Sequence, residues 1–286
     1  FILVATYFFL TKRYWWTGIA LGFALGTKWS ALYFIAVFGA IGLYRAFTHH
    51  SGRDLFKPTL ARIGQFGITP LVIYISSWAG WFASNRGWDR NYSSNVFSSF
   101  IYYHQQMLGF HTGLTDKHTY QASPWSWLVM GRPTSFFYDA PTNCGAKNCA
   151  REVLALGTPV LWWIGTIAIA VVIGYWIKSL INRTTNSAAQ IVSLGIVAGY
   201  LPWFAMQQRT MFSFYAIVIA PFMVLAIVYC AKLLLDSELK PAVSQAIVGG
   251  LFAVILLCFI YFLPLYTGQT ITYDQWKMRM WFDSWI

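Results

Sequence analysis

Long apolar stretches, separated by short polar connections, constrain this chain more than any other feature of its sequence. After an apolar start at residues 1–10, the long stretches cover residues 14–44, 64–84, 153–177, 189–206, 211–235 and 242–266. Charged residues make up only 10% of the chain, whereas soluble domains have about 25%. A stretch of about 20 apolar residues is long enough to cross a bilayer as a helix. The sequence therefore predicts an all-α polytopic membrane protein.

The stretch 14–44 is too long for a single span. As one helix it would measure ~46 Å at 1.5 Å per residue, against a hydrocarbon core of ~30 Å. The sequence Gly26-Thr27-Lys28 near its middle predicts a turn between two spans, one of them short.

Basic residues predict the orientation of these spans. With two spans in 14–44, the connections on one side of the membrane carry ten basic residues, namely Lys12, Arg13, Arg45, Arg53, Lys57, Arg62, Lys178, Arg183, Lys232 and Lys240. The short turns on the other side carry only Lys28 and Arg209. Cytoplasmic loops are enriched in Lys and Arg, so we expect a multi-pass protein of the plasma membrane with the loop 85–151 and the tail 267–286 outside. This distribution of basic residues explains the net charge of +11. The chain has no dense run of basic residues of the kind that binds nucleic acid, so we expect no nucleic-acid partner.

The long loop 85–151 holds most of the polar sequence. Apolar residues at helical spacing within 93–108 predict an amphipathic helix, which either lies in the membrane interface or packs against the helix bundle. Cys144 and Cys149 lie near the end of the loop. In an extracytoplasmic loop they would form a small disulfide; the alternative is two free thiols.

Lys28 and Arg209 are the candidate anion-binding residues, because cations at the outer ends of helices are placed to bind an anionic headgroup or a lipid phosphate. The alternative is that they are ordinary charges in turns. None of the nine acidic residues falls inside an apolar stretch, which argues against an ion-coupled transporter.

Three histidines, His104, His111 and His118, recur every seven residues. On one continuous helix they would share a face and could bind a metal, but Gly109, Gly113 and the polar residues that follow argue against one helix. We therefore expect no metal and no cofactor. We expect His111 or His118 to donate or accept substrate hydrogen bonds, with an ordinary polar loop residue as the alternative.

An ordered set of motifs resembles one known family, the bacterial polyprenyl-phosphate-mannose–protein O-mannosyltransferases. The resemblance covers nearly the whole chain, although each motif alone is weak. The motifs are Gly22-Phe-Ala-Leu-Gly-Thr-Lys-Trp-Ser-Ala-Leu-Tyr33, Met107-Leu-Gly-Phe-His-Thr-Gly-Leu114, Ser123-Pro-Trp-Ser-Trp127, Arg132-Pro133, Glu152-Val-Leu-Ala-Leu-Gly-Thr-Pro159 with Trp162-Trp163, Pro202-Trp-Phe204, Arg209-Thr-Met-Phe212 and Met280-Trp-Phe-Asp-Ser-Trp-Ile286.

This resemblance implies a GT-C-type membrane glycosyltransferase of family 39, an inverting enzyme that moves mannose from a polyprenyl-phosphate donor to Ser or Thr hydroxyls of exported proteins. It implies a division into 1–84, the end of the N-terminal GT-C region, and 85–286, the extracytoplasmic loop with four C-terminal spans. The family's catalytic Asp lies in a first outer loop, which we expect before residue 1, so we expect no catalytic residue in this chain. The implied partners are the lipid donor, secreted or membrane protein acceptors, the export machinery and membrane lipids.

Under this interpretation Lys28 and Arg209 hold the donor phosphate, and His111, His118, Trp125 and Arg132 line the path of the sugar or the acceptor. Two alternatives remain. One is another GT-C enzyme that uses a lipid-phosphate sugar with a glycolipid or glycan acceptor. The other is a non-enzymatic membrane scaffold or a transporter.

Overall fold

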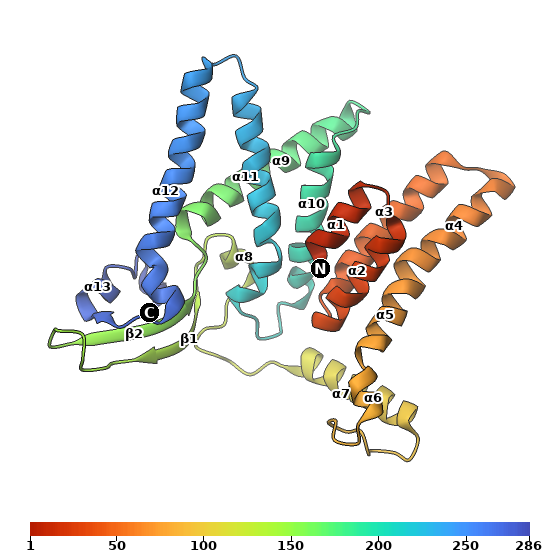
Figure 1. The fold of residues 1–286 in the computed structure, drawn as a ribbon, viewed down its shortest axis with the longest axis horizontal. Helices are drawn as coiled ribbons and strands as arrows, with labels where there is room; N and C mark the ends of the chain where they lie inside the picture. The colour runs from red at the N-terminus through yellow and green to blue at the C-terminus, as the bar shows by residue number, and fades with distance from the viewer. The chain divides into compact units, whose positions relative to one another are not determined.

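The computed structural model describes all residues from Phe1 to Ile286, and it is mostly helical (Figure 1). The chain divides into two compact units, Phe1–Leu114 and Thr115–Ile286. Four helices are long and apolar enough to cross a membrane by length and composition, namely Ala31–His49, Pro159–Ile181, Ser187–Met206 and Pro241–Thr267. The boundary between the units lies inside the loop 85–151, whereas the predicted division at residue 85 separates membrane regions and stays a prediction.

The first unit contains helices joined by turns and has no strand. Its elements are α1 (Ile2–Leu10), α2 (Tyr14–Thr27), α3 (Ala31–His49), the short 3-10 helix η1 (Gly52–Leu55), α4 (Phe56–Ile63), the π-helical turn η2 (Gly64–Ile68), α5 (Thr69–Ser77), α6 (Ala79–Ala83) and α7 (Val96–Gly113). The predicted turn at Gly26-Thr27-Lys28 is confirmed, because α2 ends at Thr27 and α3 begins at Ala31.

Glycines on one face of α2 allow it to pack closely on the η2–α5 helix. A Cβ atom on Gly18 would lie 2.0 Å from the carbonyl oxygen of Gln65, and one on Gly22 would lie 2.5 Å from Cβ of Ile73. One turn further on, a Cβ on Gly26 would lie 2.9 Å from Oγ of Ser77. Small residues four positions apart let helix backbones approach each other within membranes. This glycine stripe therefore fixes α2 against α5.

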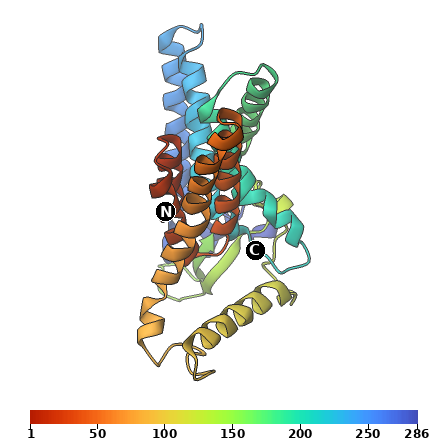
Figure 2. The same cartoon turned by 90° about the vertical axis from the view of Figure 1, so that its right-hand side faces the viewer.

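The second unit combines long helices with a small sheet. Its elements are α8 (Pro124–Trp127), β1 (Thr134–Asp139), β2 (Cys149–Ala155), α9 (Pro159–Ile181), α10 (Ser187–Tyr200), η3 (Leu201–Met206), η4 (Ser213–Val218), α11 (Ala220–Leu235), α12 (Pro241–Thr267), β3 (Ile271–Thr272), α13 (Tyr273–Lys277) and η5 (Asp283–Trp285). In Figures 1 and 2 the sheet lies at one end of α12, and the turn between α11 and α12 lies at the other.

The start predicted for the span 153–177 is wrong. The sequence from Cys149 to Ala155 forms strand β2, which pairs antiparallel with β1 and β3, and the helix begins at Pro159. A short apolar run does not distinguish a buried strand from a helix by its pattern. Proline favours the first turn of a helix, and it sets the start of α9. Cys144 and Cys149 form a disulfide near the turn between β1 and β2, with Cα atoms 5.9 Å apart.

Two prolines, Pro202 and Pro221, mark breaks in the apolar stretches 189–206 and 211–235. Pro202 is the second residue of the 3-10 segment η3, which follows α10, and Pro221 lies in the first turn of α11. The spans predicted at 189–206 and 211–235 are therefore each built from an α-helix and a 3-10 segment. A proline lacks the N–H that a helix interior needs, which accounts for both breaks.

Candidate functional site

The turn between α2 and α3 carries Lys28, the first candidate anion-binding residue. Lys28 is exposed and caps the C-terminus of α2, where its backbone N–H donates to the carbonyl of Ala24 at 2.9 Å. The next residue, Trp29, turns its ring toward α5, and its indole N–H donates to the hydroxyl of Tyr74 at 3.0 Å. The turn that presents Lys28 is therefore attached to α5 by a specific bond.

A chain of hydrogen bonds extends this attachment to α7. The Tyr74 hydroxyl lies 2.7 Å from Nε2 of His104, and Nδ1 of His104 lies 2.8 Å from the carbonyl oxygen of Phe100. A carbonyl oxygen can only accept, so Nδ1 carries the proton and Nε2 accepts from Tyr74. This arrangement gives the side chains of Trp29, Tyr74 and His104 hydrogen-bond partners.

Helix α7 is longer than the sequence predicts. The expected helix 93–108 exists, but it starts at Val96, capped by the Asn95 side chain, and continues through Gly109 to Gly113. Glycine in a helix interior costs about 1 kcal/mol relative to alanine, so Gly109 alone does not end the helix. His111 therefore shares a helix with His104, and the rings of both contact Trp29, at centroid distances of 6.3 and 5.8 Å.

The structure thus brings two predicted residues to one place, since Lys28 adjoins Trp29 and His111 contacts it. Sequence reasoning missed Tyr74 and Trp78, whose rings lie 5.7 and 5.0 Å from that of His104, and it gave His104 no role except in a disfavoured metal site. The seven-residue spacing of His104 and His111 is the sequence feature that indicates a shared helix face for the two residues. His118 lies beyond the end of α7, in the second unit.

Replacing Tyr74 with phenylalanine tests this network. The change leaves the Trp29 indole N–H without its acceptor and His104 without its donor, so we expect a loss of about 1–3 kcal/mol in the free energy of unfolding. Unfolding of the purified protein in mixed detergent micelles measures it. Tyr44→Phe is the matched control, because Tyr44 is exposed. Equal effects of the two substitutions would contradict the network.

In the second unit, the turn after η3 presents Arg209. Its guanidinium lies over the ring of Tyr215, 5.8 Å from the centroid. The Thr210 hydroxyl donates to the backbone carbonyl of Asp116, and the ring of His118 lies 5.1 Å from that of Phe212. The Arg209 turn and the segment that carries His118 are therefore packed together.

The two tryptophans of Ser123-Pro-Trp-Ser-Trp127 have different environments. Trp125 is 71% exposed and only its edge-to-face contact with Phe204, at 4.7 Å, holds its ring. Trp127 is 1% exposed, and its indole N–H donates to the carbonyl of Ala122 at 3.0 Å. Trp125 is therefore available to a ligand, whereas Trp127 belongs to the core.

Arg132 uses its guanidinium to hold the C-terminal segment. It donates to the carbonyl oxygens of Thr119 at 3.1 Å and of Ser284 and Ile286 at 2.6 Å each, and it lies over the ring of Tyr120. Through these bonds Arg132 joins the segment around Thr119 to the C-terminal residues. The predicted place of Arg132 on a substrate path stays a prediction.

Glu152 is a buried carboxylate in β2. It is 4% exposed, and Oε2 accepts from the Trp276 indole N–H at 2.6 Å. The pKa of the neighbouring Tyr138 is raised above its ordinary value by burial, by Tyr273 and by the charge of Glu152. On the exposed part of the same hairpin Asp139 pairs with Arg151 at 3.0 Å. These acidic side chains have structural partners.

Comparisons with known proteins agree with this architecture. Residues 96–285 match the family model of the C-terminal four-transmembrane region of protein-O-mannosyltransferase. The chain is 31% identical to a polyprenol-phosphate-mannose–protein mannosyltransferase of Mycolicibacterium smegmatis and 29% identical to that of Corynebacterium glutamicum, in each case over 95% of this chain and 58% of the relative. The chain thus spans less than two thirds of these relatives.

A solved structure shows the same fold. It is the Saccharomyces cerevisiae protein O-mannosyltransferase Pmt1-Pmt2 complex bound to the sugar donor, which matches 68% of this chain and 27% of its own chain with a TM-score of 0.56 and 23% identity. The predicted polytopic GT-C helical fold is confirmed. Because the family model matches well over half of its residues, the chain belongs to the protein O-mannosyltransferase family.

Proposed function

We propose that the protein that contains this chain transfers mannose from a polyprenyl-phosphate-mannose donor to Ser or Thr hydroxyls of exported proteins. One observation carries the proposal: 95% of the chain aligns at 31% identity with an enzyme named for this reaction. The activity is a proposal because the chain spans 58% of that relative.

The transfer needs an acceptor hydroxyl, a carboxylate base and cations beside the donor phosphate. The acceptor hydroxyl attacks the anomeric carbon, a carboxylate base takes the hydroxyl proton, and the bond from the anomeric carbon to the phosphate oxygen breaks with inversion. Negative charge then builds up on the departing lipid phosphate, where fixed cations stabilise it. We propose that the carboxylate belongs to a part of the protein before residue 1, and that this chain supplies the cations and part of the cavity wall.

We propose Lys28 and Arg209 for the donor phosphate. Both occupy short turns at helix ends, and the residues that adjoin them are fixed by the bonds of Trp29 and of Thr210. Exposed aromatic and imidazole groups suit the sugar and acceptor path, which we assign to His111, His118 and Trp125. Arg132 would act on that path through the C-terminal segment it holds.

The proposed orientation follows from charge. Lys28 and Arg209 then face the outside of the plasma membrane together with the loop 85–151, because the other connections carry the excess of Lys and Arg. The acceptors would be proteins that emerge from the export machinery. The proposed division at residue 85 would separate the end of the GT-C region from the four C-terminal spans.

A transfer assay with the purified full-length protein tests the function. We expect radiolabelled mannose to move from polyprenyl-phosphate-mannose to a Ser/Thr-containing peptide and not to the same peptide with alanine at those positions. A glycolipid acceptor is the second arm. Transfer to the glycolipid alone would assign the protein to another lipid-phosphate-sugar enzyme, and no transfer to either acceptor would contradict the proposal.

A further inference from the structure

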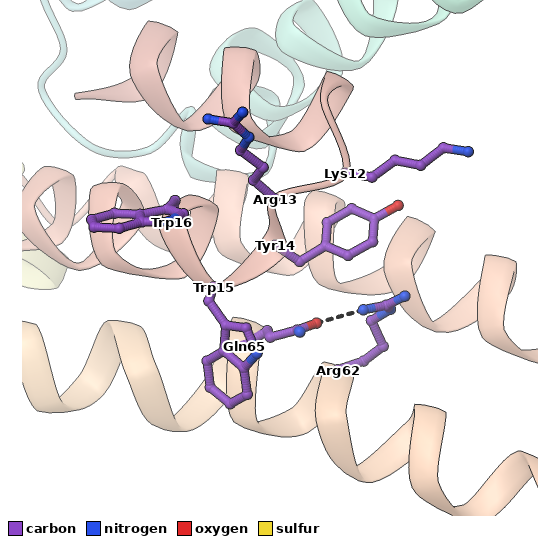
Figure 3. A pocket seen from close by; sticks show the side chains of 7 residues that line it. All are labelled: Lys12, Arg13, Tyr14, Trp15, Trp16, Arg62 and Gln65. Carbon is purple, nitrogen blue, oxygen red and sulfur yellow. Dashed lines mark hydrogen bonds between the residues drawn. The ribbon is translucent and has the colours of Figure 1, made fainter.

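A second group of cations lies at the opposite end of α2 from Lys28. There the α1–α2 turn and the α4–η2 segment enclose an open pocket of about 640 Å³ (Figure 3). Arg13 is the N-cap residue of α2 and Lys28 is its C-cap residue, so the two groups are separated by the helix length, ~21 Å for 14 residues at 1.5 Å each. The pocket is lined by Lys12, Arg13, Tyr14, Trp15, Trp16, Arg62 and Gln65.

The positive charge of this pocket is not neutralised within the protein. Lys12, Arg13 and Arg62 form no ion pair with a carboxylate within 4 Å, unlike Arg151 and Lys232, which pair with Asp139 and Asp236. Like charges that gather without a counter-charge repel each other. A pocket of this kind is suited to an anion.

Arg62 is held in place before any ligand arrives. Its guanidinium lies over the ring of Tyr14, 4.1 Å from the centroid, and donates to Oε1 of Gln65 at 2.5 Å. Its Nε atom is buried and donates no hydrogen bond. Buried donors are nearly always satisfied in folded proteins, and an unsatisfied one at a cationic pocket favours an acceptor from outside.

The turn that carries Lys12 and Arg13 has an unusual backbone. Lys12 has a φ angle of +59°, a conformation that is easy for glycine and uncommon for other residues. Both side chains are exposed and free to turn toward the pocket.

Exposed tryptophans beside the pocket favour a position at the headgroup level of a membrane. Trp15 and Trp16 are more than half exposed beside it, and tryptophans of this kind anchor membrane proteins at the headgroup level. The side chain of Arg13 does not cap the first turn of α2, whose backbone N–H groups add to the positive field. Basic pockets between membrane helices bind lipid phosphates.

We propose that this pocket binds the phosphate of an anionic membrane phospholipid, at a site separate from the donor phosphate at Lys28. Lys12 and Arg13 would pair with the phosphate from the turn, and Arg62 would donate from the facing helix. The site goes beyond the proposed mannosyl transfer and does not depend on it.

Native mass spectrometry of the full-length protein in detergent tests the proposal, with phosphatidylglycerol as the probe and phosphatidylcholine as the zwitterionic reference. The double substitution Lys12→Gln with Arg13→Gln is the test variant. Its control is Lys178→Gln with Arg183→Gln, which removes the same charges from the exposed end of α9 and the turn after it, where Arg183 also has a positive φ of +52°.

We expect the test variant to bind phosphatidylglycerol about tenfold to thirtyfold more weakly, since each basic residue near the membrane surface contributes about 1 kcal/mol. The control should stay within about twofold of the unmodified protein. An equal loss in both variants, or equal binding of the two lipids, would overturn the site. Competition by glycerol-3-phosphate or inorganic phosphate at concentrations similar to the lipid would identify a soluble ligand and overturn the lipid assignment.

Folding and function are checked separately. Size-exclusion chromatography of each variant shows whether it is folded, and lipid binding is measured without the mannose donor. If mannosyl transfer is not detected but the lipid result holds, the pocket stands and the proposed function fails. If transfer is detected and the lipid result fails, only the pocket is wrong.

Discussion

Replacing Lys28 with alanine is expected to lower kcat/KM for mannosyl transfer by about 10²–10³-fold. This is the usual loss when one group that stabilises developing negative charge is removed. Lys28 is exposed at the end of α2 and adjoins Trp29, whose indole N–H is bonded to Tyr74, so its removal should change the chemistry with little effect on the fold. Initial rates with the purified full-length protein and labelled donor give the measurement.

Two further variants sharpen this test. Lys57→Ala removes an exposed lysine from α4 in the same unit and should leave kcat/KM within about twofold. Lys28→Arg keeps the positive charge and should recover part of the rate. If Lys28→Ala keeps full donor affinity and turnover, the phosphate role of Lys28 is wrong. The same substitution at Arg209 tests the second cation independently.

Replacing Trp127 with alanine is expected to lower the free energy of unfolding by about 3–5 kcal/mol, the range for large aromatic residues in a core. Trp127 is fully buried, and its ring contacts those of Trp203 and Tyr215 at 5.7 and 6.1 Å. Its backbone carbonyl accepts from the Trp162 indole N–H at 2.8 Å, which ties α8 to α9. Unfolding in mixed detergent micelles measures the loss.

Trp125 provides the matched control two residues away. It is largely exposed, so Trp125→Ala should change stability by no more than about 0.5 kcal/mol. Trp127→Phe should cost less than alanine, about 1–3 kcal/mol, because the ring remains but the bond to Ala122 is lost. Similar losses for Trp125→Ala and Trp127→Ala would contradict the assignment of one tryptophan to the surface and the other to the core.

The sequence predicts features that depend on length and local composition. The turn at Lys28 is predicted because a helix of the length of 14–44 exceeds the bilayer, and the structure confirms it. The strand at Cys149–Ala155 is missed because its last three residues continue into the apolar sequence before α9, and pairing with β1 and β3 decides its conformation. The extent of α7 is misjudged because the cost of Gly109 in a helix is small.

Contacts between distant residues are beyond such reasoning. Tyr74 and His104 are separated by 30 residues, and Arg132 bonds to carbonyl groups more than 150 positions later. Each of these residues is an ordinary polar or aromatic side chain in its own segment. Their partners follow only from how the helices pack.

The glycine stripe of α2 has a mechanical consequence. Gly18 and Gly22 leave no slack between α2 and the η2–α5 helix, so α2 cannot slide along its neighbour without steric collision. Because Arg13 and Lys28 cap the two ends of this one helix, the distance between the two cationic groups is set by the length of α2. We therefore expect any movement that admits a lipid carrier or releases a product to come from other helices. A larger residue at Gly22 would push α2 away from α5 and release Lys28 from its fixed position.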